Sequence, residues 1–152
     1  GQVLIQNELQ RPQDWSLDRQ PFLLETNSES FKEELQLLAN DFSNNVRWID
    51  SFTRKKIHLT AIYCNNFTNH LINLAQQFSD KNRIDFSLFY PLINETISKA
   101  IELGANYSQT GPAKRNDLVT INSHIDLLEG DMKTIYIQLT NSILENNGYQ
   151  KL

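Results

Sequence analysis

The stretch that decides the fold is RKKIHLTAIYCNNFTNHLINLAQQFSD, residues 54–80, which has the spacing of an amphipathic helix. Its apolar side chains recur three, four or seven residues apart and share one side of an α-helix: Ile57, Ala61, Cys64, Leu71, Ala75 and Phe78. A stripe that continues over about seven turns predicts the central helix of the chain.

Three further helical segments follow the central one. The first, residues 85–104, begins at a capping aspartate, contains a kink at Pro91 and stops at a glycine. Segments 116–130 and 131–148 repeat the helical spacing of apolar residues, and each ends at a glycine. We therefore expect a helical domain over residues 53–152, folded as an antiparallel bundle around the long helix.

The region before the central helix has the order strand, helix, strand. PFLLE (21–25) and VRWID (46–50) have strand patterns, and the segment between them has helical spacing with a possible capping box of Ser30 and Glu33. A βαβ crossover implies a parallel pair of strands, which is marginal when alone. Residues 1–52 are therefore predicted to be the margin of a larger sheet, to which QVLIQ near the start adds another strand.

Composition argues against several classes of protein. The net charge of −4 over 152 residues disfavours a nucleic-acid binder, and no apolar run approaches the ~20 residues that span a membrane. The single cysteine and the absence of a signal-peptide pattern at the start predict a cytoplasmic protein. The five glycines form no phosphate-binding loop and the three histidines have no metal-ligand spacing, so neither a dinucleotide cradle nor a metal site is expected.

A row of uncharged polar side chains lies opposite the apolar stripe of the central helix. At about 100° per residue, His58, Asn65 and Asn69 align there, with Asn73 and Ile62 beside them. Imidazole and carboxamide groups donate and accept hydrogen bonds without a permanent charge, which suits a partly dry cleft that holds a polar ligand. The alternative is that these groups bond water or neighbouring backbone.

The segment SQTGPAKRND, residues 108–117, holds a second set of polar groups. Its Gly-Pro break ends one helix, and either Asn116 or Asp117 can cap the next. Capping does not explain Thr110, Lys114 and Arg115, and two cations at a helix start attract carboxylate or phosphate. The alternative is a structural ion pair between Arg115 and an acidic residue such as Asp117 or Glu95.

Glu95 and Thr96 lie in the helical stretch PLINETISKA. Glu95 precedes Lys99 by four residues, so the spacing alone predicts an exposed helix face with an ordinary ion pair. Thr96 fits an orientation toward the bundle equally well.

Three stretches together resemble a known group of proteins. RKKIHLTAIYCNNFTNHL, DFSLFYPLINET, and QTGPAKRND followed by HIDLL are similar, in that order, to the helical C-terminal domain of uncharacterised bacterial proteins that begin with a Rossmann-type domain. These proteins are described as similar to deazaflavin-dependent NADP oxidoreductases, and their C-terminal part is like that of 6-phosphogluconate dehydrogenase relatives. The resemblance runs from about residue 14 to about residue 142, and TGPAxRxD is its most specific string.

The resemblance implies that the βαβ segment is left from a Rossmann sheet and that NADP or NAD is bound mainly by an N-terminal domain. It also places eleven residues at the nicotinamide end of that cofactor, across the domain cleft: His58, Asn66, Asn69, His70, Glu95, Thr96, Thr110, Gly111, Pro112, Arg115 and Asp117. One departure from related hydroxyacid dehydrogenases is Ile62, because they carry an acid/base lysine four residues before an asparagine equivalent to Asn66.

Together these observations predict the substrate-binding and dimer-forming portion of an NAD(P)-dependent oxidoreductase, inactive without its Rossmann domain. His58 is the candidate catalytic acid or base, because imidazole is the side chain best suited to proton transfer near neutral pH. Arg115 would fix a small anionic or carbonyl substrate, and the partner would be a second copy of the chain. The alternatives are a non-catalytic helical dimerisation module and a stand-alone ligand sensor.

Overall fold

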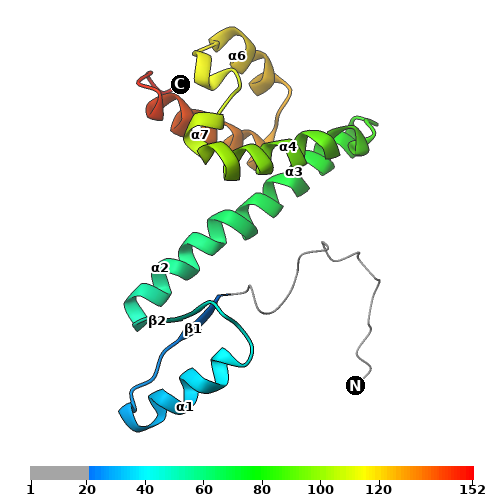
Figure 1. Cartoon of the computed structure of the whole chain (residues 1–152). Helices are drawn as coiled ribbons and strands as arrows, with labels where there is room; N and C mark the ends of the chain where they lie inside the picture. Colours follow the sequence, from blue (N-terminus) through cyan, green and yellow to red (C-terminus); the bar gives the residue numbers. More distant parts are fainter. Residues whose placement is uncertain (1–20) are drawn as a thin grey trace. The chain divides into compact units, whose positions relative to one another are not determined.

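The computed structural model describes residues 21–152 and has the predicted order of elements, a short βαβ segment followed by helices (Figure 1). The predicted strand QVLIQ lies outside the described residues. The regular elements are β1 (Phe22–Leu24), α1 (Glu29–Asn40), β2 (Val46–Trp48), α2 (Ser51–Ala61), η2 (Ile62–Phe67), α3 (Thr68–Lys81), η3 (Phe86–Phe89), α4 (Tyr90–Lys99), η4 (Ala100–Gly104), α5 (Ala105–Ser108), η5 (Ala113–Arg115), α6 (Leu118–Asp126) and α7 (Gly130–Asn146).

The two strands pair in parallel, as the crossover pattern predicts. The register joins Phe22 to Val46 and Leu24 to Trp48, and α1 forms the crossover between them. The predicted capping box is wrong, because α1 begins at Glu29 and places Ser30 inside the helix. The hydroxyl of Ser30 instead hydrogen-bonds the hydroxyl of Ser28 at 2.9 Å.

Helix α1 is held against the strands by a small number of contacts. Leu24 and Ala39 are buried between these elements. The indole N–H of Trp48 donates to Gln36 Oε1 at 2.6 Å, and the Lys32 ammonium lies 5.5 Å from the centre of the Trp48 ring. These polar contacts fix α1 on one side of β2, while the two strands provide little apolar area for a core of their own.

The central stretch is helical at every residue from Ser51 to Lys81, but it is not α-helical throughout. The Asp50 carboxylate caps α2 by accepting from the Thr53 N–H at 2.7 Å. Residues 62–67 then form a π-helical turn, η2, which the sequence pattern did not predict. The chain divides into two compact units, residues 1–68 and 69–152. The domain boundary predicted at residues 52/53 stays a prediction.

The second unit has its buried core between η5, α6 and α7. Ile121 and Leu144 are completely buried there with Ala113, and Ile125, Tyr136 and Ile143 pack against them. The predicted caps are confirmed: Asp85 caps η3 and Asp117 caps α6. Pro91 does not kink a helix but lies in the first turn of α4, where its missing N–H has no cost.

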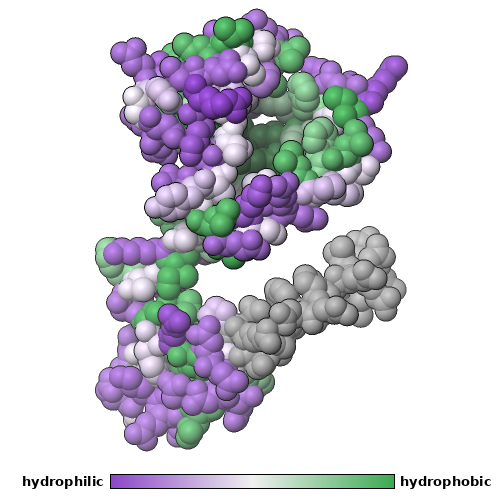
Figure 2. All heavy atoms as spheres, turned by 45° about the horizontal axis from the view of Figure 1, so that its top comes forward, coloured by the Kyte–Doolittle hydropathy of each residue, from purple (hydrophilic) through white to green (hydrophobic). Residues whose placement is uncertain are grey.

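Apolar side chains remain exposed over much of the described chain. Neither α2 nor η2 buries a residue among those the structure describes, so the predicted stripe is uncovered at Ile57, Cys64 and Leu71. Among the aromatic residues of this region, Tyr63, Phe67 and Tyr90 are exposed, and Phe78, Phe86 and Phe89 are half-buried. Figure 2 shows hydrophobic groups on the surface and around a hollow in the helical part. Within residues 21–152 no helix is long and apolar enough to cross a membrane.

Candidate functional site

The π turn changes which polar residues share a face with His58. A π turn adds one residue to a helix, so later positions are displaced by about 100° relative to an uninterrupted α-helix. The position that continues the face of His58 is therefore Asn66, eight residues on, and not Asn65, seven residues on. The hydrogen bond from Thr68 Oγ1 to the Tyr63 carbonyl, at 3.2 Å and five residues apart, follows this wider turn.

The side chains of this set are available to a ligand. His58, Asn65 and Asn66 are exposed, and no residue in the described part of the chain hydrogen-bonds their side chains. Single π turns inside α-helices occur frequently at functional sites. A count through the π turn thus puts His58 and Asn66 on one face of one helical run, and the role of these residues in a site stays a prediction.

In the second unit, Asn69 and His70 occupy consecutive positions in the first turn of α3. Both are exposed, and neither side chain has a hydrogen-bond partner within residues 21–152. Their carboxamide and imidazole groups can therefore donate to or accept from a bound molecule.

Glu95 and Thr96 are adjacent on α4 and are both already engaged. The Glu95 carboxylate forms an ion pair with Lys99, and this ammonium lowers the pKa of the carboxyl group. The Thr96 hydroxyl donates to the Leu92 carbonyl at 2.8 Å. These contacts are those of an exposed helix face. A role for the two residues in a site stays a prediction from the resemblance.

The loop from 108 to 117 has a defined backbone conformation. Gly111 has φ +99°, a region that L side chains rarely adopt, although no atom would contact a Cβ placed there. Pro112 leads into the short helix η5, and Asn116 is left-handed with φ 55°. A residue with positive φ thus lies on each side of η5, which explains why the segment contains both a glycine and an asparagine.

Asp117 uses both carboxylate oxygens to start α6. Oδ1 accepts from the Thr120 N–H at 3.1 Å, and Oδ2 accepts from the Thr120 hydroxyl at 2.8 Å. These hydrogen bonds hold the pKa of Asp117 below its usual value, and the charge of Arg115 lowers it further. Asp117 is therefore a structural cap, and its contacts leave little capacity for a ligand.

Arg115 lacks the structural partner that the sequence left open. Its side chain is exposed, and it forms no ion pair with a carboxylate of residues 21–152. Asp117 is occupied by Thr120 and Glu95 by Lys99. The loop thus presents a guanidinium that forms no ion pair within the described residues, and this group suits a carboxylate or phosphate. Thr110, close to it in sequence, is also exposed.

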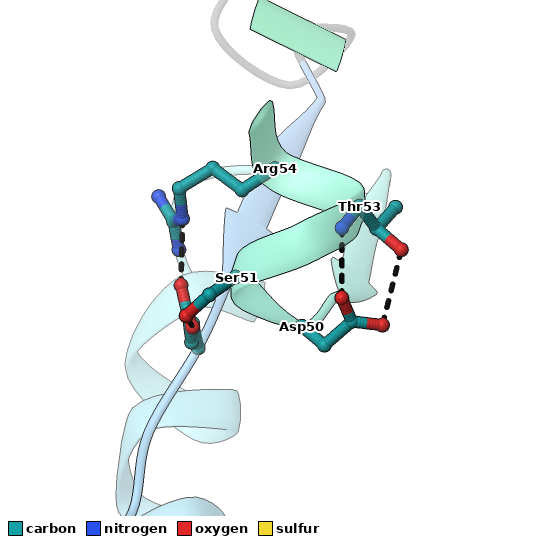
Figure 3. A network of polar contacts seen from close by, with 5 residues as sticks. Asp50, Ser51, Thr53 and Arg54 are labelled. Atoms are coloured by element: carbon teal, nitrogen blue, oxygen red, sulfur yellow. Dashed lines mark hydrogen bonds and ion pairs between the residues drawn. The ribbon is translucent and has the colours of Figure 1, made fainter. Parts of the chain in front are cut away.

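One polar cluster of the first unit was missed by the sequence reasoning (Figure 3). Glu25 follows β1, and its two oxygens accept from the Ser51 hydroxyl and from Arg54 Nε, the latter at 2.7 Å. Both hydrogen bonds lower the pKa of Glu25. The sequence contained the information for this contact, because a glutamate follows one predicted strand and an arginine follows the next. Parallel strands end at the same edge of a sheet, so the two side chains can meet there. No group of three or more His, Cys, Asp or Glu within the described ranges could hold a metal ion.

Comparisons with known proteins agree with this description. The chain is similar to the crystal structure of a putative NADP oxidoreductase from Bacteroides fragilis, with 37% sequence identity and a TM-score of 0.80. The match covers 86% of the present chain. The chain spans 51% of that protein, about half its length. The search of curated proteins found no match. The family described as Domain of unknown function (DUF2520) matches residues 20–143, and this chain belongs to that family.

Proposed function

We propose that this chain is the substrate-binding and dimer-forming part of an NADP- or NAD-dependent oxidoreductase, which acts together with a Rossmann domain. The observation that carries the proposal is the likeness to the Bacteroides fragilis protein, which is about twice as long and is described as a putative NADP oxidoreductase. The parallel β1–β2 pair supports it, because two strands are the margin of a larger sheet and not a sheet that is stable alone. The Rossmann domain would make most contacts to the cofactor.

The residues of the helical run have defined roles in this proposal. His58 transfers the proton at the reacting carbonyl or hydroxyl group, and Asn66, Asn69 and His70 hydrogen-bond the substrate. Arg115 fixes an anionic group of the substrate, since its guanidinium has no carboxylate partner in the part of the chain described. Hydride transfer belongs to the cofactor, so the chain without the Rossmann domain is inactive.

The proposal includes a cytoplasmic homodimer and a helical part like that of 6-phosphogluconate dehydrogenase. Support for a dimer comes from η4 and α5, where Ile101 is 79% and Tyr107 is 84% exposed. Large apolar side chains at this exposure, next to Leu103 and Ile97, form the kind of patch that monomers rarely leave uncovered.

The test is NADPH and NADH oxidation by the complete protein over a panel of carbonyl substrates with and without a carboxylate. We expect His58→Ala to lower kcat by about 100-fold or more, because general acid/base catalysis contributes on the order of 10²–10⁴. Arg115→Ala should raise KM for the carboxylate-bearing substrates only. Arg47→Ala, which removes an exposed arginine hydrogen-bonded to Asn45, is the control for loss of charge. An unchanged kcat in His58→Ala together with an unchanged KM in Arg115→Ala would contradict the assignment.

A second candidate is a helical interaction module without catalysis. It is favoured by α2 and η2, which bury no residue within the described chain. Their exposed apolar side chains are more typical of a protein–protein interface than of a site for a polar substrate. Solvent protection of His58 and Asn66 in a dimer of the complete protein, with no oxidation of either cofactor, would support this module over the oxidoreductase.

A further inference from the structure

The first two turns of α2 carry three side chains that can donate hydrogen bonds, two of them cationic and one an imidazole, on one surface of the helix. Arg54 and Lys55 lie four and three residues before His58, and these spacings make both of them neighbours of the histidine on an α-helix. Side chains of a helix lean toward its N-terminus, so the imidazole of His58 leans over the turn that carries the two cations. The three residues form a triangle, which we call the α2 triangle.

The carboxylates nearest this triangle are already used as hydrogen-bond acceptors. Asp50 accepts from both the N–H and the hydroxyl of Thr53, at 2.7 and 3.0 Å. Glu25 accepts from Ser51 on one oxygen and from Arg54 on the other. In Figure 3 the Asp50 and Thr53 side chains lie on one side of the first turn of α2, and those of Ser51 and Arg54 lie on the other. The acceptor atoms are therefore largely saturated, while donor atoms remain.

The donors that remain belong to the α2 triangle. Arg54 contacts Glu25 through Nε, and its two terminal nitrogens make no hydrogen bond within residues 21–152. Lys55 has no partner in the same range, whereas the next cation, Lys56, lies 4.1 Å above the ring of Phe52. A guanidinium held at Nε loses part of its rotamer freedom before a ligand arrives, which lowers the entropic cost of binding.

We propose that the α2 triangle binds an oxyanion, a phosphate or carboxylate group, with Glu25 acting as the positioning residue for Arg54. The inference extends the proposed function, on which it rests, because it adds an anion site beside His58 in the first unit to the one proposed at Arg115. Arg54 and Lys55 supply charge and donors, and His58 supplies an N–H. The oxyanion belongs either to the substrate, as a carboxylate, or to the cofactor, as a phosphate.

The test follows the imidazole proton signals of His58 by NMR while inorganic phosphate is added to the complete protein. The pH is held constant, and sodium chloride at matched ionic strength is the reference. We expect saturable shifts for the wild type, with an affinity about fivefold or more lower for Arg54→Ala, because one of the charged hydrogen-bonding groups is lost. Glu25→Gln should weaken binding to a smaller extent, since it releases Arg54 without removing it. Arg47→Ala, the control for net charge, should bind as the wild type does.

Acetate replaces phosphate in the second arm and distinguishes the two sources of the oxyanion. Tighter phosphate binding assigns the triangle to the cofactor, and tighter acetate binding assigns it to the substrate. Arg54→Lys keeps the charge and the fold but cannot hold the Nε contact, so it should bind less tightly than the wild type. Equal affinity in Arg54→Ala and Arg47→Ala, or shifts that chloride reproduces, would overturn the proposal. The measurement requires no turnover, so its failure is distinct from failure of the oxidoreductase function.

Discussion

Individual polar side chains in this protein divide into those that build turns and those that have no partner in the described chain. Asp117 and Arg115 are two residues apart and illustrate both kinds. The aspartate has its oxygens occupied by Thr120, and the arginine has no carboxylate partner among the described residues. The sequence alone could not separate the two roles. The same residues are compatible with an Arg–Asp ion pair and with an aspartate that caps a helix beside an arginine without a carboxylate partner.

The cap at Asp117 gives a pH-dependent stability. Hydrogen bonds from Thr120 lower its pKa in the folded state, so its stabilisation is present above the unfolded pKa, about 3.9, and is lost as the pH falls through the lower folded value. Asp117→Asn should therefore reduce the Tm at pH 7 and match the wild type at about pH 2. Thermal melts followed by circular dichroism measure this difference.

Asp126→Asn is the matched control, because it removes the same charge from the last turn of the same helix. It should leave the Tm at pH 7 unchanged or slightly raised, since a negative charge is unfavourable at that end. A gap between Asp117→Asn and wild type that persists undiminished at low pH would show that the cap does not depend on its charge.

At the scale of elements, the helices and strands were predictable and their packing was not. Periodicity located β1, β2 and the helical run, and the Asp85 and Asp117 caps were located by residue type. The π turn was missed, since a π turn leaves no mark in a pattern that is counted at 3.6 residues per turn. The spacing therefore aligned Asn65 with His58, whereas a count through the π turn aligns Asn66, and the role of either residue in a site stays a prediction.

Inserting one alanine after Cys64 tests the importance of the spacing that the π turn sets. The insertion places one more residue between His58 and Asn66, which displaces Asn66 by about 100° from the face of His58. Helical content by circular dichroism should stay the same, while kcat/KM of the complete protein should fall about 100-fold, the size of effect expected from a misplaced binding group. Cys64→Ala keeps the length of the turn and should retain activity. Full activity in the insertion variant would exclude a role for this spacing.

The junction of α6 and α7 carries the stability of the helical unit. Ile121 is completely buried against Leu144, and the His124 ring hydrogen-bonds the Tyr136 hydroxyl at 2.9 Å beside them. Ile121→Ala should cost about 2–5 kcal/mol of unfolding free energy, from lost transfer energy and an unfilled cavity. Val119→Ala, two residues away and 84% exposed, should change it by less than about 0.5 kcal/mol. Urea unfolding measures both, and equal costs would mean that this core is not the stabilising one.

At the scale of the whole molecule, many more apolar side chains of the described chain are exposed than are buried in its core. Only five hydrophobic residues of the described part are buried, while apolar side chains of α1, η2, α4, η4 and α5 are exposed. Sequence periodicity indicates which side chains avoid water, but it does not say whether they are covered by the same chain or by another one. The predicted stripe on the central helix was therefore correct as a pattern and wrong as a buried core.

This surplus leads to a prediction about assembly. If η4 and α5 form the dimer interface, charge introduced at their most exposed apolar positions has to be desolvated when two copies meet, which costs several kcal/mol. The double variant Ile101→Glu, Tyr107→Glu should therefore sediment as a monomer over a dilution series in which the wild type has twice the mass of one chain. Leu37→Glu, at a similarly exposed position on α1, is the control and should remain dimeric. Dissociation by the control alone would move the interface to the βαβ segment, and a monomeric wild type would assign the exposed surface to a different partner.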